Sequence, residues 1–403
     1  MIATFSVSNY RSIRDTQSIS FLSTKDKSYK DLDTQEVAKG VFINKIAIFL
    51  GPNASGKSNI LYAMKAIVAM MSSPCKDKKD RIIHYIPFKM KGESSCVMSL
   101  EFYIDGSKYD YNLEFNATDI IKETLYYVPS RSKALIYSRK YTGEDKQPAV
   151  SFGSTIGLFA STKNELLKHT YNNSTILSTV AKLSLKDDAE ILTKIFKWAD
   201  SRVLSSGNAS PISKYYTELQ EIDRNGAKKN LFMDLMRKAD FNISGLKVME
   251  NSDVEDGKID VYFTNHSEEG DFETPLELQS EGTLRFIDLA DLLYNIKQGN
   301  YVYLLDELGN KLHYELIVYF LRMFLYNSES SQLIFTTQSL LLLDEDFIRN
   351  DMIYLTEKEA LSASSTYERV SDIGLRRETP LYKWYRIGKL GAFPEVGSPY
   401  IAQ

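Results

Sequence analysis

Eight residues, Gly51 to Ser58, read GPNASGKS and match G-x-x-x-x-G-K-[ST], the loop that encloses nucleotide phosphates. Residues 45–50 before the loop form a short apolar run, which is typical of a buried strand. After Lys57, apolar residues recur at helical spacing as far as Ser72, and Pro74 ends the pattern. Strand, loop and helix in this order are the context that such a loop requires. The sequence therefore predicts a P-loop in an α/β core.

The residues of this loop have expected roles. Glycines let backbone N–H groups approach phosphate oxygens, and the following helix directs its positive end at the same charge. Lys57 would reach the β- and γ-phosphates as a catalytic residue, and the Ser58 hydroxyl would ligate Mg²⁺. ATP and Mg²⁺ are therefore the expected cofactors. The residues expected to bind the nucleotide are Gly51, Pro52, Asn53, Ala54, Ser55, Gly56, Lys57, Ser58 and Asn59.

A second motif, YVYLLDELGNKLH at residues 301–313, is an apolar strand that ends in two acids. Asp306 is predicted to hold Mg²⁺ through water, and Glu307 is predicted to polarise the attacking water as a general base. The alternative is that the two acids at the end of the strand only cap a helix. The presence of the P-loop favours the functional interpretation.

Two further motifs occur in the last third of the chain. Ser280 and Gly282 precede a helical pattern at 283–296, and they could clamp the γ-phosphate of a nucleotide held by a second subunit. The other interpretation is an N-cap and a turn. Gln338 follows a buried strand in LIFTTQS, residues 333–339, and is a candidate γ-phosphate sensor. A simple strand-end turn explains that stretch equally well.

Composition restricts the possible functions. The 403 residues carry a net charge of −4, so the average charge gives no support to nucleic-acid binding. Cys75 and Cys96 are too few for a disulfide framework or a four-cysteine zinc site, and the four histidines show no metal-ligand spacing. No apolar run approaches the ~18 residues that span a bilayer, and the first residues lack the apolar core of a signal peptide. We expect a cytoplasmic protein without membrane contact.

The pattern of strands and helices predicts a core that is formed by the two ends of the chain, with the middle of the chain inserted into it. Residues 1–75 and 265–403 alternate strand and helix and are expected to form one ATPase core. Residues 76–150 are expected to form a β-rich lobe that includes a hairpin with an Asp-Gly turn. Residues 151–264 are expected to be a mainly helical insertion, and 142–155 a loop.

The four motifs, in this order, resemble those of ABC-type ATPase heads. More narrowly, the chain looks like the AAA-type ATP-binding proteins of bacterial abortive-infection and anti-phage systems, whose heads are related to the SMC and overcoming-lysogenisation-defect families. Residues 5–23 (FSVSNYRSIRDTQSISFLS) are similar to the N-terminal NFRSF strand pair of that family. Residues 385–394 (YRIGKLGAFP) resemble its C-terminal Y-x-x-G-x-x-G-A-x-P, and residues 99–127 resemble its β-lobe.

This resemblance implies an α/β fold, namely a P-loop NTPase of the ABC-ATPase type with an N-terminal β-lobe and an inserted mainly helical lobe. It also implies heads that dimerise around ATP, so that each nucleotide contacts the P-loop of one subunit and Ser280 and Gly282 of the other. Relatives act beside a separate effector, often a nuclease or a toxin. The family has histidine where Gln338 stands, and an amide cannot take the protonation states of an imidazole. We therefore expect slow hydrolysis.

Three alternatives to an ATP-hydrolysing regulator stay open. The first is a nucleotide-dependent scaffold in which Glu307 is idle. The second is a DNA-repair-type head that binds DNA directly, although the acidic net charge and the lack of long heptad arms argue against it. The third is a small-molecule kinase, which would leave Ser280 and Gly282 unexplained.

Overall fold

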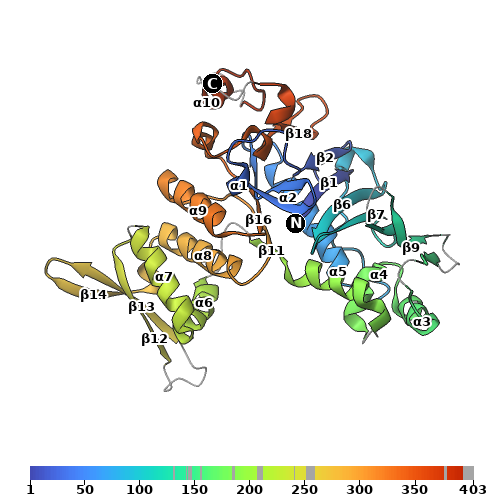
Figure 1. The fold of residues 1–403 in the computed structure, drawn as a ribbon, viewed down its shortest axis with the longest axis horizontal. Coiled ribbons are helices and arrows are strands. Elements are labelled where there is room, and N and C mark those ends of the chain that lie inside the picture. Colours follow the sequence, from blue (N-terminus) through green and yellow to red (C-terminus); the bar gives the residue numbers. More distant parts are fainter. Residues whose placement is uncertain are drawn as a thin grey trace, which may run out of the picture. The chain divides into compact units, whose positions relative to one another are not determined.

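The computed structural model (Figure 1) describes residues 1–129, 132–141, 143, 148–154, 157–183, 187–206, 212–239, 241–250, 259–375 and 379–393. Contacts within the chain divide it into two compact units. Unit 1 comprises Met1–Ser206, Asn300–Asp306 and Ser330–Gln403. Unit 2 comprises Gly207–Gly299 and Glu307–Glu329.

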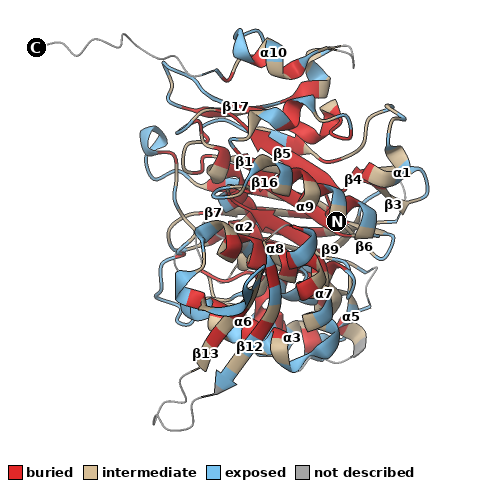
Figure 2. Ribbon diagram, turned by 90° about the vertical axis from the view of Figure 1, so that its left-hand side faces the viewer, coloured by how far each residue is buried: buried red, intermediate tan, exposed pale blue. Residues whose placement is uncertain are grey.

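The central sheet of unit 1 has the strand order β11-β15-β16-β5-β17-β18. The first five strands are parallel neighbours, and β18 is antiparallel to β17. Every residue of β5, β15 and β16 is buried, as expected for apolar runs covered on both faces, and Figure 2 shows β5 and β16 in the buried colour. The strands are β5 (Ile46–Leu50), β11 (Val203–Ser206), β15 (Val302–Leu305), β16 (Gln332–Thr336), β17 (Ile353–Lys358) and β18 (Ser365–Arg369).

A second sheet of unit 1 is antiparallel, with the order β10-β9-β8-β7-β6-β1-β2. The predicted hairpin is confirmed, because Asp105 and Gly106 join β6 to β7 with φ of 46° and 78°, as a two-residue turn of the Asp-Gly type requires. The strands are β1 (Ile2–Ser8), β2 (Gln17–Ser20), β6 (Cys96–Ile104), β7 (Ser107–Phe115), β8 (Ile120–Val128), β9 (Ala134–Lys140) and β10 (Ala149–Phe152). A separate pair consists of β3 (Thr34–Ala38) and β4 (Val41–Asn44).

Helix α2 (Lys57–Ser72) connects the two sheets, since it contacts β15 and β16 of one and β6 of the other. Its buried apolar face has the helical spacing predicted from the sequence. Beside it, Trp198 of α5 stacks on Phe102 of β6 at 4.3 Å between ring centroids. The remaining helices of unit 1 are α1 (Lys30–Asp33), α3 (Ala160–His169), α4 (Ile176–Thr179), α5 (Glu190–Ser201) and α10 (Leu381–Arg386).

A fully buried amide also joins the two sheets. The Ile2 N–H donates to Oε1 of Gln332 at 2.8 Å, and Nε2 of Gln332 donates to the Ile2 carbonyl at 3.0 Å. Gln332 starts β16 and Ile2 starts β1. Because a buried backbone group needs a partner, this side chain fixes where β1 lies against the central sheet.

Unit 2 combines helices with a small antiparallel sheet of order β12-β13-β14. Helix α6 contacts β12 and β13, α7 contacts β12 and α8, and α8 contacts α9. Among the described helices of the whole chain, none is both long enough and apolar enough to cross a membrane. The elements of unit 2 are α6 (Ile212–Arg224), α7 (Gly226–Lys238), β12 (Ile243–Glu250), β13 (Ile259–Ser267), β14 (Gly270–Pro275), α8 (Glu281–Ile296) and α9 (Tyr314–Asn327).

In two places the structure has a short strand where the sequence was interpreted as another kind of structure. Strand β10 occupies part of the stretch that was interpreted as a loop, and β11 lies in the stretch interpreted as mainly helical. Both have only four residues and form the edge of a sheet, and such short runs do not identify a strand from the sequence. Pro394, the end of the C-terminal motif, lies outside the described residues.

The compact units also divide the chain differently from the expected lobes. Residues 265–299 and 307–329, expected in the core, group with unit 2, and residues 151–206, expected in the insertion, group with unit 1. Grouping by contacts does not assign function to a segment. The division into ATPase core, β-rich lobe and helical insertion therefore stays a prediction.

We expect Gln332→Leu to lower the free energy of unfolding by about 2–4 kcal/mol, because each buried backbone group that loses its partner costs about 1–3 kcal/mol. The midpoint of thermal unfolding measures the effect. Gln35→Leu is the control, since the Gln35 amide donates to the Glu36 carbonyl on an exposed stretch. Equal midpoints for the two variants would contradict the role of Gln332.

Candidate functional site

The P-loop has a backbone that requires glycine at two positions. Gly51 has φ of 157° and Gly56 has φ of 106°, where other residues are strained. A Cβ on Gly51 would lie 2.3 Å from the Thr356 carbonyl oxygen, and one on Gly56 would lie 2.1 Å from Ser365 Oγ. The loop is therefore pressed directly against β17 and β18.

Lys57 is buried at the start of α2, and its ammonium closes the loop. Its Nζ donates to the carbonyl oxygens of Gly51 and Pro52, both at 2.8 Å. Asn53 and Ala54, in contrast, are exposed at the tip of the loop. The ammonium thus sits inside the ring of backbone atoms in which the motif places a phosphate.

Ser58 and Asp306 meet directly, although 248 positions separate them in the sequence. The Ser58 hydroxyl donates to Oδ1 of Asp306 at 2.8 Å, and the Thr336 hydroxyl donates to the same oxygen at 2.6 Å. Asp306 follows β15 and Thr336 ends β16, so the parallel strands bring both residues to the carboxyl edge of the sheet. Hydroxyl and carboxylate oxygens are ligands that Mg²⁺ prefers, so this pair fits the ion.

Strand β18, which no sequence motif indicated, also holds the P-loop. Ser365 Oγ donates to the Ser55 carbonyl at 2.6 Å, and the Tyr367 hydroxyl donates to the Gly56 carbonyl at 2.8 Å. Burial raises the pKa of Tyr367 well above its usual value, so the phenol keeps the proton that it donates. Both hydrogen bonds engage carbonyl groups of the loop and use none of its N–H groups.

The opening of the chain supports the same loop. Ser12 Oγ lies 2.7 Å from Ser365 Oγ and accepts a hydrogen bond from Asn59 Nδ2 at 2.6 Å. Asn59 was expected to contact the nucleotide, and here its amide binds Ser12. Ser12 belongs to the opening motif NYRSI, which was the available signal for this residue. A serine in a short strand such as β18 carries no comparable signal.

Glu307, the expected general base, begins a segment of unit 2 directly after Asp306. Its φ is 50°, a left-handed conformation that is uncommon for a residue other than glycine. Nδ2 of Asn310 donates to Oε2 of Glu307 at 3.3 Å, and the Asn310 N–H donates to the Glu307 carbonyl at 3.1 Å. Such strained residues concentrate at functional sites, where the surrounding structure holds them in place.

Ser280 and Gly282 lie at the first turn of α8, also in unit 2. Ser280 is its N-cap, because its hydroxyl oxygen accepts from the Thr283 N–H at 3.1 Å. A Cβ on Gly282 would lie 2.9 Å from the Lys311 carbonyl oxygen, and Lys311 also pairs with Glu281. The small residues thus let α8 approach the loop that follows Glu307.

Gln338 is exposed two residues beyond the end of β16. The preceding Thr337 N–H donates to the Phe49 carbonyl at 3.1 Å, which continues the pairing of β16 with β5. Gln338 therefore lies on the same edge of the sheet as Thr336 and Asp306. Its role as a sensor stays a prediction.

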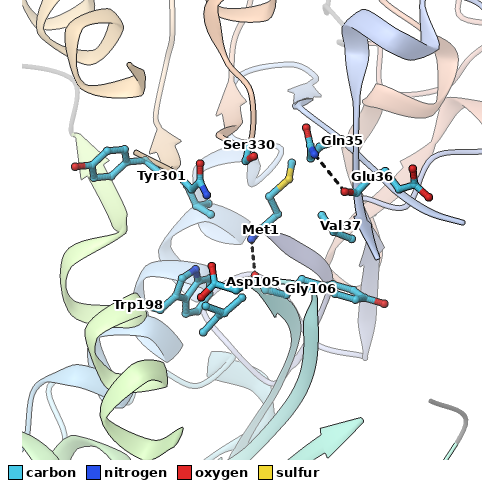
Figure 3. A pocket seen from close by; sticks show the side chains of 13 residues that line it. Met1, Gln35, Glu36, Val37, Asp105, Gly106, Trp198, Tyr301 and Ser330 are labelled. Atoms are coloured by element: carbon cyan, nitrogen blue, oxygen red, sulfur yellow. Dashed lines mark hydrogen bonds between the residues drawn. The ribbon is translucent and has the colours of Figure 1, made fainter. Parts of the chain in front are cut away.

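A cavity of about 150 Å³ lies at the edge of the central sheet opposite to the P-loop (Figure 3). It borders the amino end of β15 at Tyr301, whereas the P-loop follows the carboxyl end of the parallel strand β5. Trp198, Asp105 and Met1 also line it, and the Met1 ammonium donates to the Tyr103 carbonyl at 2.9 Å. The cavity is thus separate from the residues that the sequence predicts to bind nucleotide.

Comparison with protein families shows one that matches residues 46–344, described as "AAA domain, putative AbiEii toxin, Type IV TA system". A curated relative, the zinc import ATP-binding protein ZnuC of Ehrlichia chaffeensis, is 26% identical over 117 residues. That alignment covers 29% of this chain and 46% of the relative, so the chain spans about half the length of ZnuC.

Solved structures of SMC heads resemble the chain at low identity. The SMC head domain from Thermotoga maritima is 14% identical, with a TM-score of 0.43, over 91% of this chain and 98% of that one. An SmcHead bound to the C-winged helix domain of ScpA is 15% identical, with a TM-score of 0.48, over 91% and 97%. An Smc head with an extended coiled coil from Pyrococcus furiosus, bound to the C-terminal domain of ScpA, is 12% identical, with a TM-score of 0.41, over 96% and 99%.

The family match spans well over half of the chain and contains the P-loop, Asp306, Glu307 and Gln338. The central sheet, with a P-loop between β5 and α2, is that of an α/β P-loop NTPase. The protein therefore belongs to the family of AAA domains described as putative AbiEii toxin of type IV toxin–antitoxin systems.

Proposed function

We propose that the chain binds ATP with Mg²⁺, dimerises around the nucleotide, hydrolyses it, and thereby controls a separate effector protein in bacterial anti-phage defence. The observation that carries this proposal is the 2.8 Å hydrogen bond between Ser58 and Asp306. It brings the P-loop and the second acidic motif to one point at the edge of the sheet. That convergence is what an ATPase site of this class needs.

In this scheme the loop from Gly51 to Asn59 surrounds the phosphates, and Lys57 leaves its two carbonyl partners to pair with phosphate oxygens. Ser58 and Asp306 would hold Mg²⁺, which neutralises charge on the phosphates when it is bound. Thr336 orients the carboxylate of Asp306 through its own hydrogen bond. Ser365 and the rest of the supporting network keep the loop in the shape that a phosphate requires.

Hydrolysis needs a water that attacks the γ-phosphorus while the bond to the β-phosphate oxygen breaks. Glu307 accepts the proton from that water, and Gln338 donates an amide hydrogen bond to the γ-phosphate. The left-handed backbone conformation of Glu307, directly after Asp306, supports a general base whose carboxylate is held in one orientation. An amide at position 338 cannot act as an acid or a base as an imidazole can, and this supports slow hydrolysis of ATP.

Dimerisation would bring Ser280 and Gly282 of one subunit to the nucleotide of the other. The capped start of α8 supports this, since a helix N-terminus favours a negative ligand. Leu278, two residues before the cap, exposes 73% of its surface. An apolar side chain at that place gains stability if a second subunit covers it.

The family description names a toxin–antitoxin system, which has two components, and this supports a separate partner protein; we propose that the partner is an effector such as a nuclease or a toxin. In this proposal the ATP-bound and ATP-free states of the dimer differ in affinity for the effector, so hydrolysis shifts the population between them. A scaffold that binds ATP without hydrolysis is the second candidate, and it is favoured by the glutamine at 338.

We expect Gly56→Ala to weaken ATP binding at least about tenfold, because a strained φ costs about 1–3 kcal/mol and the new Cβ would displace Ser365. Calorimetric titration with Mg-ATP measures the loss. Gly226→Ala is the matched control, because a Cβ there meets nothing within 4 Å. Wild-type affinity in Gly56→Ala would contradict the proposed phosphate site.

We expect Glu307→Gln to slow phosphate release by about 100-fold or more, the usual contribution of a general base, and to retain ATP binding. Because ATP then persists, light scattering should show a dimer that accumulates with ATP. Glu359→Gln, on an exposed turn, should leave the rate unchanged. If the wild type releases no phosphate either alone or with its partner protein, the scaffold is correct instead.

Position 338 tests the sensor. We expect Gln338→Leu to lower the rate of phosphate release, because leucine cannot donate to the γ-phosphate, and Gln338→His to raise it about three- to tenfold, since imidazole can also transfer a proton. Both rates are measured at saturating Mg-ATP. An unchanged rate in Gln338→Leu would exclude a role for this residue.

A further inference from the structure

A cavity of about 500 Å³ lies at the carboxyl end of α2 and the segment that follows it, away from the phosphate site. Helix α2 begins at the P-loop with Lys57 and ends at Ser72, so the cavity is at the opposite end of the same helix. Much of its lining is apolar, and the side chains concerned are Met70, Pro74, Ile82 and Ile83. A ligand-sized apolar hollow is typical of a binding site.

Ile83 distinguishes this cavity from an ordinary surface depression. It exposes 82% of its surface, whereas Ile82 and Met70, which also line the cavity, are buried. A branched apolar side chain in water beside an apolar hollow loses stability that a docked partner would restore. The cavity and the exposed Ile83 together form a place where one apolar side chain of a partner can insert.

The rim of this cavity is basic, in a chain with a net charge of −4. Lys76, Asp80 and Arg81 line it, and all three belong to the run KDKKDR at residues 76–81, which has four cations and two acids. The two acids of the run bind its own backbone, since Asp77 accepts from the Lys79 N–H and Asp80 from the Asp77 N–H, each at 2.8 Å. Within the part of the chain that the structure describes, the four cations of the run form no ion pair. These exposed cations therefore favour an acidic ligand.

We propose that this surface, defined by Met70, Ile82, Ile83, Lys76 and Arg81, docks an acidic segment of a separate protein. One apolar side chain of that segment fills the hollow, and carboxylates on either side of it pair with the cations of the rim. The inference rests on the proposed function, in which a separate effector is controlled, and it states the chemistry by which that partner is recognised.

The shape and lining of the surface favour a protein over other acidic ligands. Nucleic acid is held by contacts to phosphates and needs no exposed isoleucine beside an apolar hollow. An anionic membrane offers a flat surface, which cannot fill a concave site. An amphipathic protein segment satisfies the apolar hollow and the cations together.

The segment that carries Ile83 is also tied to the support of the P-loop. The Arg11 N–H donates to the Ile86 carbonyl at 2.7 Å, and the Phe88 N–H donates to Oδ1 of Asn9 at 3.1 Å. Ser12, the next residue of that turn, binds Asn59 and Ser365 at the phosphate site. Hydrogen bonds thus connect the docking surface with the loop that holds the nucleotide.

The test uses the full chain without nucleotide and two synthetic helical peptides. Both carry leucines on one face, and the remaining positions are glutamates in one peptide and lysines in the other. By fluorescence anisotropy at low ionic strength we expect the glutamate peptide to bind at least about tenfold more tightly than the lysine peptide, because like charges at an interface repel. Added salt should reduce that difference.

Variants assign the binding to this surface. Ile83→Ser should weaken binding of the glutamate peptide about tenfold, whereas Met90→Ser, which is 84% exposed but outside the cavity, should not. The pair Lys76→Glu and Arg81→Glu should reverse the preference in favour of the lysine peptide. Since all four side chains are exposed, loss of folding does not account for these effects.

Three outcomes would overturn the docking surface: equal binding of both peptides, equal effects of Ile83→Ser and Met90→Ser, or tighter binding of a DNA oligonucleotide or of anionic vesicles to these cations. Lys57→Ala separates this inference from the proposed function. That chain should lose ATP binding and still bind the glutamate peptide as the wild type does. If peptide binding fails while ATP is hydrolysed normally, the docking surface is wrong and the proposed ATPase is unaffected.

Discussion

The hydrogen bond from Ser58 to Asp306 is the interaction on which the nucleotide site depends. A carboxylate as buried as that of Asp306 is unfavourable unless polar groups surround it, and Ser58 and Thr336 supply two donors to one oxygen. The parallel pairing of β15, β16 and β5 makes the contact possible, because it ends the strands at a common edge. The order of strands thus determines the chemistry at that edge.

The P-loop depends on a second layer of polar contacts as much as on its own residues. Ser365 and Tyr367 bind carbonyl groups of the loop, and Ser12 binds Asn59 and Ser365. Hydrogen bonds in a buried network are strong but also costly to break. Loss of one of these contacts would therefore destabilise the loop.

The chain passes from one compact unit to the other between Asp306 and Glu307. The residues proposed to hold Mg²⁺ belong to unit 1, while the proposed base belongs to unit 2 together with Ser280 and Gly282. Contacts through Lys311 join the start of α8 to the loop after Glu307. The proposed base and the small-residue motif therefore belong to the same compact unit.

The sequence alone determined the parts that local pattern encodes: the P-loop between β5 and α2, the buried strand before Asp306, and the hairpin at Asp105 and Gly106. Glycine spacing and apolar periodicity are properties of adjacent residues, so they can be recognised without coordinates. The two motifs already predicted Ser58 and Asp306 around one Mg²⁺ ion, and the structure adds their direct hydrogen bond. Only the tertiary structure decided the support from Ser365 and Tyr367 and the pairing of β11 with β15. These features depend on which distant segments pack together. A short segment of the sequence does not by itself indicate which distant segment it will contact.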